Sequence, residues 1–158
     1  MSGLQDIGTT PPALVDTARR RADLHDAIIA LEHAAACPAS GREPAWSATV
    51  LEVLDDLEPE IVEHIDCTES PDGLYAEIAE AAPQLIHTLD DLRAEHVRMR
   101  TDVRLLIASL AGATSPSRET VDQARDDIQR LLGLLVRHRQ RGAEVVWETY
   151  DLDIGDSD

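Results

Sequence analysis

The sequence predicts an all-α protein, an up-down-up-down antiparallel four-helix bundle. Four long segments carry apolar residues at spacings of three and four, short turn-like segments separate them, and no stretch alternates apolar and polar residues as a β-strand does. The length of 158 residues suits one domain. Phe is absent and aromatic residues make up 3%, so the core must consist of aliphatic side chains, which fill helix interfaces well.

The first two helices are expected over residues 11–36 and 44–69, separated by the loop CPASGRE at 37–43. Residues 1–10 are polar and are expected to be flexible. The apolar stripe of the first helix comprises Leu14, Ala18, Ala22, His25, Ile29 and Ala36. The stripe of the second comprises Leu54, Leu57, Ile61, His64 and Thr68. Pro59 lies inside the second helix and predicts a kink or a break there, because it removes a backbone donor.

The third and fourth helices are expected over residues 83–112 and 118–150. A turn at SPDG (70–73) and a short helical segment, LYAEIAEAA, precede the third helix, and Ser117 is the expected cap of the fourth. The third helix has the clearest stripe, formed by Leu85, Leu89, Leu92, His96, Met99, Val103, Leu106 and Leu110. The inward residues of the fourth are Val121, Ala124, Ile128, Leu132, Leu135, Val146 and Tyr150. The bundle therefore spans residues 11–150, followed by an acidic tail at 151–158.

The charge of the chain narrows the classes of partner. A net charge of −17 argues against binding to nucleic acid or to an anionic membrane, because both are polyanions. The longest apolar run, residues 131–136, is too short to span a bilayer, and no basic segment followed by an apolar one opens the chain. These features favour a cytoplasmic protein. A homodimer is left open, and no protein partner can be named.

The distribution of histidines is the main functional signal. His25, His64 and His96 lie near the middle of their apolar stripes and His138 lies at the edge of the fourth, whereas His33 and His87 are expected at the surface. A buried imidazole needs a polar partner, and inward histidines from four helices are a way to build a metal site in a bundle core. The alternative is that each is a core histidine satisfied by a neighbouring side chain or by water.

A count of residues from one end of the antiparallel bundle tests whether the four rings can meet. At 1.5 Å per residue, His64, His96 and His138 stand at heights of roughly 30, 24 and 32 Å, and His25 stands lower, at roughly 17 Å. The heights of the first three agree within the error of the predicted helix ends. The count therefore permits one cluster, and His25 fits it least well.

Several segments resemble the bacterial hemerythrin-like (HHE cation-binding) domain family. They are DLHDAIIALEHA in the first helix, LDDLEPEIVEHIDCTESPDGLYAEI in the second and its exit turn, LRAEHVRMRTDVRLL in the third, and LVRHRQRGAEVVWETYDLDIGDSD at the end of the fourth. The resemblance implies a helical bundle in which histidines and bridging carboxylates hold a pair of non-haem irons. It also implies a role in binding or sensing a metal, oxygen or nitric oxide.

The carboxylates of that pattern are mostly missing. Family carboxylates follow a histidine by four or five residues, and here only Glu69, five residues after His64, keeps that spacing. We therefore expect one metal ion, iron before zinc, held by His25, His64, Glu69, His96 and His138. The alternative is a metal-free interaction or regulatory module. Because no paired carboxylates are present to act as general acid and base, we do not expect an enzyme.

Overall fold

The computed structural model describes residues 12–155, without the side chains of 12–18, 20–21 and 152–155. All regular structure in this range is helical. The elements are α1 (Pro12–Ala36), α2 (Glu43–Glu69), α3 (Leu74–Ala81), the 3-10 turn η1 (Pro83–Leu85), α4 (Ile86–Gly112) and α5 (Arg118–Gly155). No helix within the described range is both long enough and apolar enough to cross a membrane.

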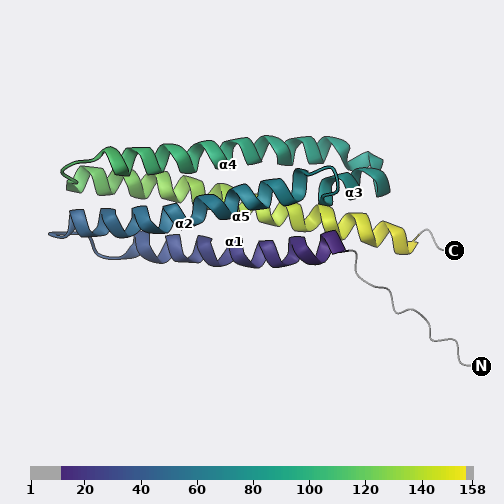
Figure 1. Cartoon of the computed structure of the whole chain (residues 1–158), viewed down its shortest axis with the longest axis horizontal. Coiled ribbons are helices and arrows are strands. Elements are labelled where there is room, and N and C mark those ends of the chain that lie inside the picture. The colour runs from purple at the N-terminus through teal and green to yellow at the C-terminus, as the bar shows by residue number, and fades with distance from the viewer. Residues whose placement is uncertain (1–11, 156–158) are drawn as a thin grey trace, which may run out of the picture.

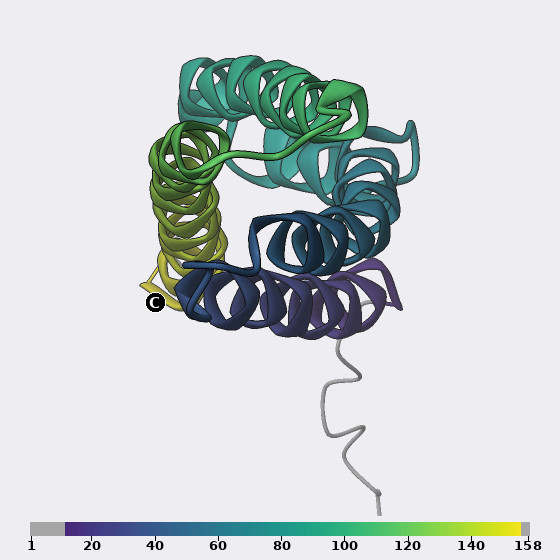
Figure 2. The same cartoon turned by 90° about the vertical axis from the view of Figure 1, so that its left-hand side faces the viewer.

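The four long helices, α1, α2, α4 and α5, lie side by side along the long axis of the molecule (Figure 1). Viewed from the end, they surround a common interior (Figure 2). Each of the four packs against two neighbours, because α1 contacts α2 and α5 and α4 contacts the same two helices. The loops 37–42 and 113–117 lie at one end, and the short helix α3 lies at the other (Figure 1).

The buried apolar residues form two clusters along the interior. The larger apolar cluster contains residues from the four long helices, among them Leu31, Leu54, Val103 and Ile128. The smaller apolar cluster lies around α3 and consists of Leu74, Tyr75, Ile78, Ala82, Leu85, Leu89, Leu92 and Val145. Aliphatic side chains supply nearly all of both clusters, as the scarcity of aromatic residues requires.

The predicted inward faces of the second and third helices are confirmed, because all the residues named for those two stripes are buried. The fourth is confirmed as far as Leu135, but Val145 is buried where Val146 was expected. The helix α2 continues through Pro59 without a break. The backbone N–H of Thr120 donates to Ser117 Oγ at 3.2 Å, which confirms the expected cap.

The predicted face of the first helix is wrong. Leu24, Ile28 and Leu31 are buried, whereas Ala22 and His25 are exposed and Ile29 is half-buried. The buried face is thus displaced by about one residue, or 100° around the helix. Burying Leu and Ile side chains removes more apolar area from water than burying Ala does, so the larger residues determine which face turns inward. Leu14 and Ala18 lie outside the described side chains.

The fourth long helix ends later than predicted. Helix α5 continues to Gly155, five residues past the expected end at Tyr150. Residues 151–155 of the predicted tail are therefore helical. The expected flexible segment at residues 1–10, and residues 156–158 of the tail, lie outside the described residues.

Candidate metal centre

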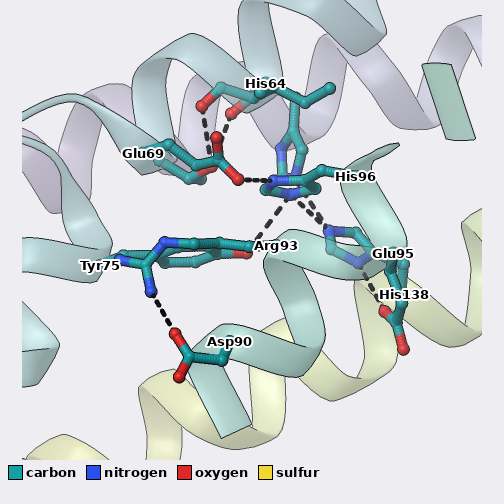
Figure 3. Close-up of polar contacts among 10 residues, drawn as sticks. His64, Glu69, Tyr75, Asp90, Arg93, Glu95, His96 and His138 are labelled. Carbon is teal, nitrogen blue, oxygen red and sulfur yellow. Dashed lines mark hydrogen bonds and ion pairs between the residues drawn. The ribbon is translucent and has the colours of Figure 1, made fainter. Parts of the chain in front are cut away.

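Three histidines from three helices meet in the interior. His64 of α2, His96 of α4 and His138 of α5 are 5%, 1% and 1% exposed (Figure 3). We call these three residues the histidine layer, because they lie between the two apolar clusters. On α4, His96 is flanked by Leu92 of the smaller cluster and Met99 of the larger one. The three rings form a compact group, with centroids 4.6–5.3 Å apart.

The Nε2 atoms of these rings point toward one another (Figure 3). Nε2 of His138 is 3.0 Å from Nε2 of His96 and 3.1 Å from Nε2 of His64. One potential ligand atom from each ring lies within 4.8 Å of the other two, and no other such group of three occurs among the described residues. Because the rings come from three helices, the packing of the helices rather than a local motif creates this arrangement.

The outer nitrogen of His96 pairs with a carboxylate. Nδ1 of His96 is 2.9 Å from Oε1 of Glu69, the last residue of α2. Burial raises the pKa of the Glu69 carboxyl and nearby Asp66 adds to this, while the charge of Arg93 opposes it. An ionised carboxylate only accepts hydrogen bonds, so this contact assigns the proton of a neutral His96 ring to Nδ1 and the lone pair to Nε2.

The outer nitrogen of His138 makes the same kind of contact. Nδ1 of His138 is 2.7 Å from Oε2 of Glu95, whose side chain is only 16% exposed. The other oxygen of Glu95 forms an ion pair with Arg141, which also lies 3.6 Å from the Asp91 carboxylate. The contact with Glu95 therefore assigns the lone pair of a neutral His138 to Nε2 as well.

The environment keeps His96 uncharged. Burial is the largest cause, and the neighbouring His138, His64 and Arg93 add to it, so that the pKa of His96 falls to about 2. The ring is therefore neutral at pH 7, with an available lone pair. Neutral imidazole is the form of histidine that binds transition metals.

A tyrosine on α3 completes the described surroundings of the layer. The Tyr75 hydroxyl is 3.3 Å from Nε2 of His96, and the two rings are parallel within 5° with centroids 5.6 Å apart. The turn before α3 depends on Gly73, where a Cβ atom would lie 2.5 Å from the carbonyl oxygen of Cys67. This close approach brings α3 back onto the end of α2.

The predicted ligands divide into three groups. His64, His96 and His138 come together. Glu69 lies beside them but contacts the outer nitrogen of His96, so it orients a ring instead of facing the common centre. His25 is exposed on α1, where its Nδ1 lies 2.8 Å from a guanidinium nitrogen of Arg139, and the expectation that it faces the core is wrong.

Two residues of the site were missed. The first is Glu95, which directly precedes His96 on α4. Its position next to a predicted ligand is the sequence signal that could have identified it. Tyr75 is the second such residue, and its side chain is 3% exposed. No sequence signal placed its hydroxyl next to His96, because that contact depends on how α3 folds back.

The donor set fits one metal ion and not two. A pair of irons needs ligands for both ions and bridging carboxylates that offset their charge. Among the described residues the layer offers three nitrogens, and its two carboxylates are engaged with the outer ring nitrogens. Three imidazoles can hold a single zinc ion, and two of the three here, His96 and His138, contact a carboxylate through their second nitrogen.

No family model matches this chain, and neither a curated protein nor a solved structure matches it significantly. The function of this helical protein is therefore inferred from its residues and from the geometry of the buried histidine layer.

Proposed function

We propose that this protein is a hemerythrin-like, up-down-up-down antiparallel four-helix bundle that binds one transition-metal ion through His64, His96 and His138. The observation that carries the proposal is the 3.0 Å separation between Nε2 of His96 and Nε2 of His138, two atoms that both bear lone pairs when the rings are neutral. Two lone pairs at that distance repel each other unless a cation or a donated proton satisfies them. Protonation of His96 is disfavoured, since its pKa is lowered to about 2. A metal ion is the alternative cation.

The nitrogen separations suit a shared metal ion. Metal–nitrogen bonds of about 2.1 Å place two ligands about 3.0 Å apart at a right angle and about 3.4 Å apart at the tetrahedral angle. The two separations from His138 are 3.0 and 3.1 Å. Both values match two ligands of one ion, and the ligand atoms of all three rings lie within 4.8 Å of one another.

The charges around the layer also support a cation. Glu69 and Glu95 place two carboxylates on the outer nitrogens, where they make the imidazoles better donors and offset positive charge at the centre. A bound ion would supply a Lewis-acidic centre for a small ligand, consistent with the binding or sensing of oxygen or nitric oxide that the resemblance implies. Iron is the metal we favour, and zinc is the second choice.

The experiment is elemental analysis of the full chain produced with iron or with zinc. We expect about one metal ion per chain, and we expect His138→Leu to lose most of it, because Leu fills the same space without a donor. His87→Ala is the matched control, since His87 is an exposed histidine of α4. Protein that is metal-free under every supply, or an equal loss in His87→Ala, would refute the proposal.

A metal-free interaction or regulatory module is the second candidate, and one observation favours it. The Tyr75 hydroxyl can donate to Nε2 of His96, and a proton on Nε2 of His64 can be donated to His138. Each inward lone pair of the two carboxylate-bound rings then has a donor. This candidate predicts a melting temperature that responds neither to EDTA nor to added iron or zinc, because a metal that binds only the folded state must stabilise it.

A further inference from the structure

Building on the proposed three-histidine site, we propose that Tyr75 is the fourth protein ligand and that its oxygen makes the site selective for ferric iron. This assigns a chemical role to the short helix α3. It also predicts which metal and which oxidation state the site prefers, which the three imidazoles alone do not determine.

The position of the Tyr75 hydroxyl supports its role as a ligand. Its oxygen lies 3.3 Å from Nε2 of His96, the nitrogen that faces the common centre, and 3.3 Å is within the range of about 3.0–3.4 Å expected for two ligands of one ion. In Figure 3 the Tyr75 side chain points into the space where the inward nitrogens gather. The residue is 3% exposed, so this orientation is held by packing.

The surroundings of the Tyr75 ring favour its ionised form. The guanidinium carbon of Arg93 lies 5.5 Å from the centroid of the Tyr75 ring, and Arg93 is held by Asp90 at 3.0 Å. A cation at this position stabilises negative charge on the phenol ring. Parallel stacking on His96 fixes the plane of the ring, so the oxygen is directed without a long flexible linker.

The chemistry of the donor set gives the preference for ferric iron. Three neutral nitrogens suit zinc well, whereas a tyrosine oxygen is a ligand of ferric haem iron in catalase. When iron enters as iron(III), the O–H bond of Tyr75 breaks, an iron–oxygen bond forms and the proton leaves to solvent, with no electron transferred. The phenolate would add a negative charge to those of Glu69 and Glu95, which favours a trivalent ion over a divalent one.

The test adds ferric nitrilotriacetate to metal-free protein and records visible absorption, resonance Raman spectra and iron content. The chain has only two tyrosines, so Tyr75→Phe and Tyr150→Phe form a matched pair. We expect wild type and Tyr150→Phe to show a tyrosinate-to-iron(III) charge-transfer band with tyrosinate vibrations. We expect Tyr75→Phe to lose the band and to lose at least about tenfold more affinity for iron(III) than for zinc. Zinc binding by Tyr75→Phe also shows that this variant is folded.

The outcomes separate the two proposals. If wild-type protein binds iron without showing the band, Tyr75 is not a ligand and the three-histidine site stands. The same conclusion follows if Tyr75→Phe binds iron and retains the band. An equal loss of iron and zinc affinity in Tyr75→Phe would also overturn the role of Tyr75. Wild-type protein that takes up neither metal would refute both proposals.

Discussion

The larger apolar cluster and the histidine layer are equally buried but are built from different chemistry. Leu54, Leu57 and Val103 of the cluster are 0% exposed, and His96 and His138 of the layer are 1% exposed. The cluster draws residues from all four long helices, including Leu24, Ile28 and Leu31 of α1. The layer draws its rings from α2, α4 and α5 only, and α3 adds Tyr75.

The two regions differ in the free energy of burying their side chains. Burial of the aliphatic residues stabilises the fold, whereas burial of the histidines costs free energy unless each ring has polar partners. An aliphatic side chain gains free energy simply by leaving water, at about 25 cal/mol per Å² of apolar surface. A buried polar group without a partner costs about 1–3 kcal/mol. The chain meets this cost with Glu69, Glu95 and Tyr75, each placed against a ring nitrogen. We infer that the layer serves a chemical role and that the larger apolar cluster serves stability.

The largest expected effect is that of metal on the melting temperature. At a metal concentration a thousandfold above the dissociation constant, binding to the folded state adds about 4 kcal/mol to the free energy of unfolding. For a chain of this size that corresponds to a rise of about 8–16 °C over the EDTA-treated protein, measurable by calorimetry. His138→Leu should abolish the rise, and His87→Ala should keep it. A rise retained in His138→Leu would place the metal elsewhere.

The next effect is that of a cavity in the larger apolar cluster. Leu54→Ala should reduce the free energy of unfolding by about 2–5 kcal/mol, because the side chain is fully buried. Leu54 precedes His64 by ten residues, or about 15 Å along α2, so the two effects should add. Urea unfolding with and without zinc checks this. If Leu54→Ala also removed the stabilisation by zinc, the layer and the cluster would not be separable.

Acid should destabilise the metal-free protein through His96. The pKa of His96 is lowered to about 2 in the folded state, so between about pH 6.5 and pH 2 the unfolded chain binds a proton that the folded chain does not. The free energy of unfolding therefore falls as the pH falls below 6.5, by roughly 1 kcal/mol per pH unit for this group. The titratable and charged groups that face this ring are His64 and Glu69 of α2, Tyr75 of α3, Arg93 of α4 and His138 of α5.

Urea unfolding at pH 7, 6 and 5 measures this dependence. Because the many carboxylates of the chain also titrate on unfolding, the useful quantity is the difference between wild type and His96→Leu. The variant should lose less stability on acidification than wild type. Equal pH dependence in the two proteins would contradict the assignment of a neutral buried His96.

The helical fold was predictable because its signal is repeated many times along the chain. All eight residues of the stripe predicted for the third helix are buried, seven of them on α4 and Leu85 in η1. The error on α1 shows the limit of this approach. Ala22 and Ile29 continue one stripe, Leu24 and Leu31 continue another, and counting apolar positions without weighting their size selected the wrong one. That choice also turned His25 inward.

The candidate site was predictable only in part, for a physical reason. Helical spacing places His64 and His96 on inward faces, and the residue count put them at similar heights with His138. Neither the spacing nor the count predicts which carboxylate contacts the outer nitrogen of each ring. The contact of His138 with Glu95, for example, joins residues 43 positions apart on different helices. The position of Tyr75 depends on the tight turn at Gly73, which the helical pattern does not describe.

The smallest predicted effect compares the two carboxylates of the layer. Replacing Glu95 or Glu69 with Gln keeps an oxygen that can accept a hydrogen bond but removes the charge, and such changes lower metal affinity by about 10–100-fold. Glu95 should have the larger effect, because its side chain is 16% exposed against 31% for Glu69 and its contact is 2.7 Å against 2.9 Å. Water therefore screens the Glu69 pair more strongly.

Zinc titration against a competing chelator measures this difference, with Glu58→Gln as the matched control. Glu58 is also on α2, is 30% exposed and forms its ion pair with Arg104, away from the layer. Its replacement should leave zinc affinity unchanged. If Glu58→Gln weakened zinc binding as much as Glu69→Gln, the effect would come from the overall charge of the protein. The contact between Glu69 and His96 would then have no particular part in holding the metal.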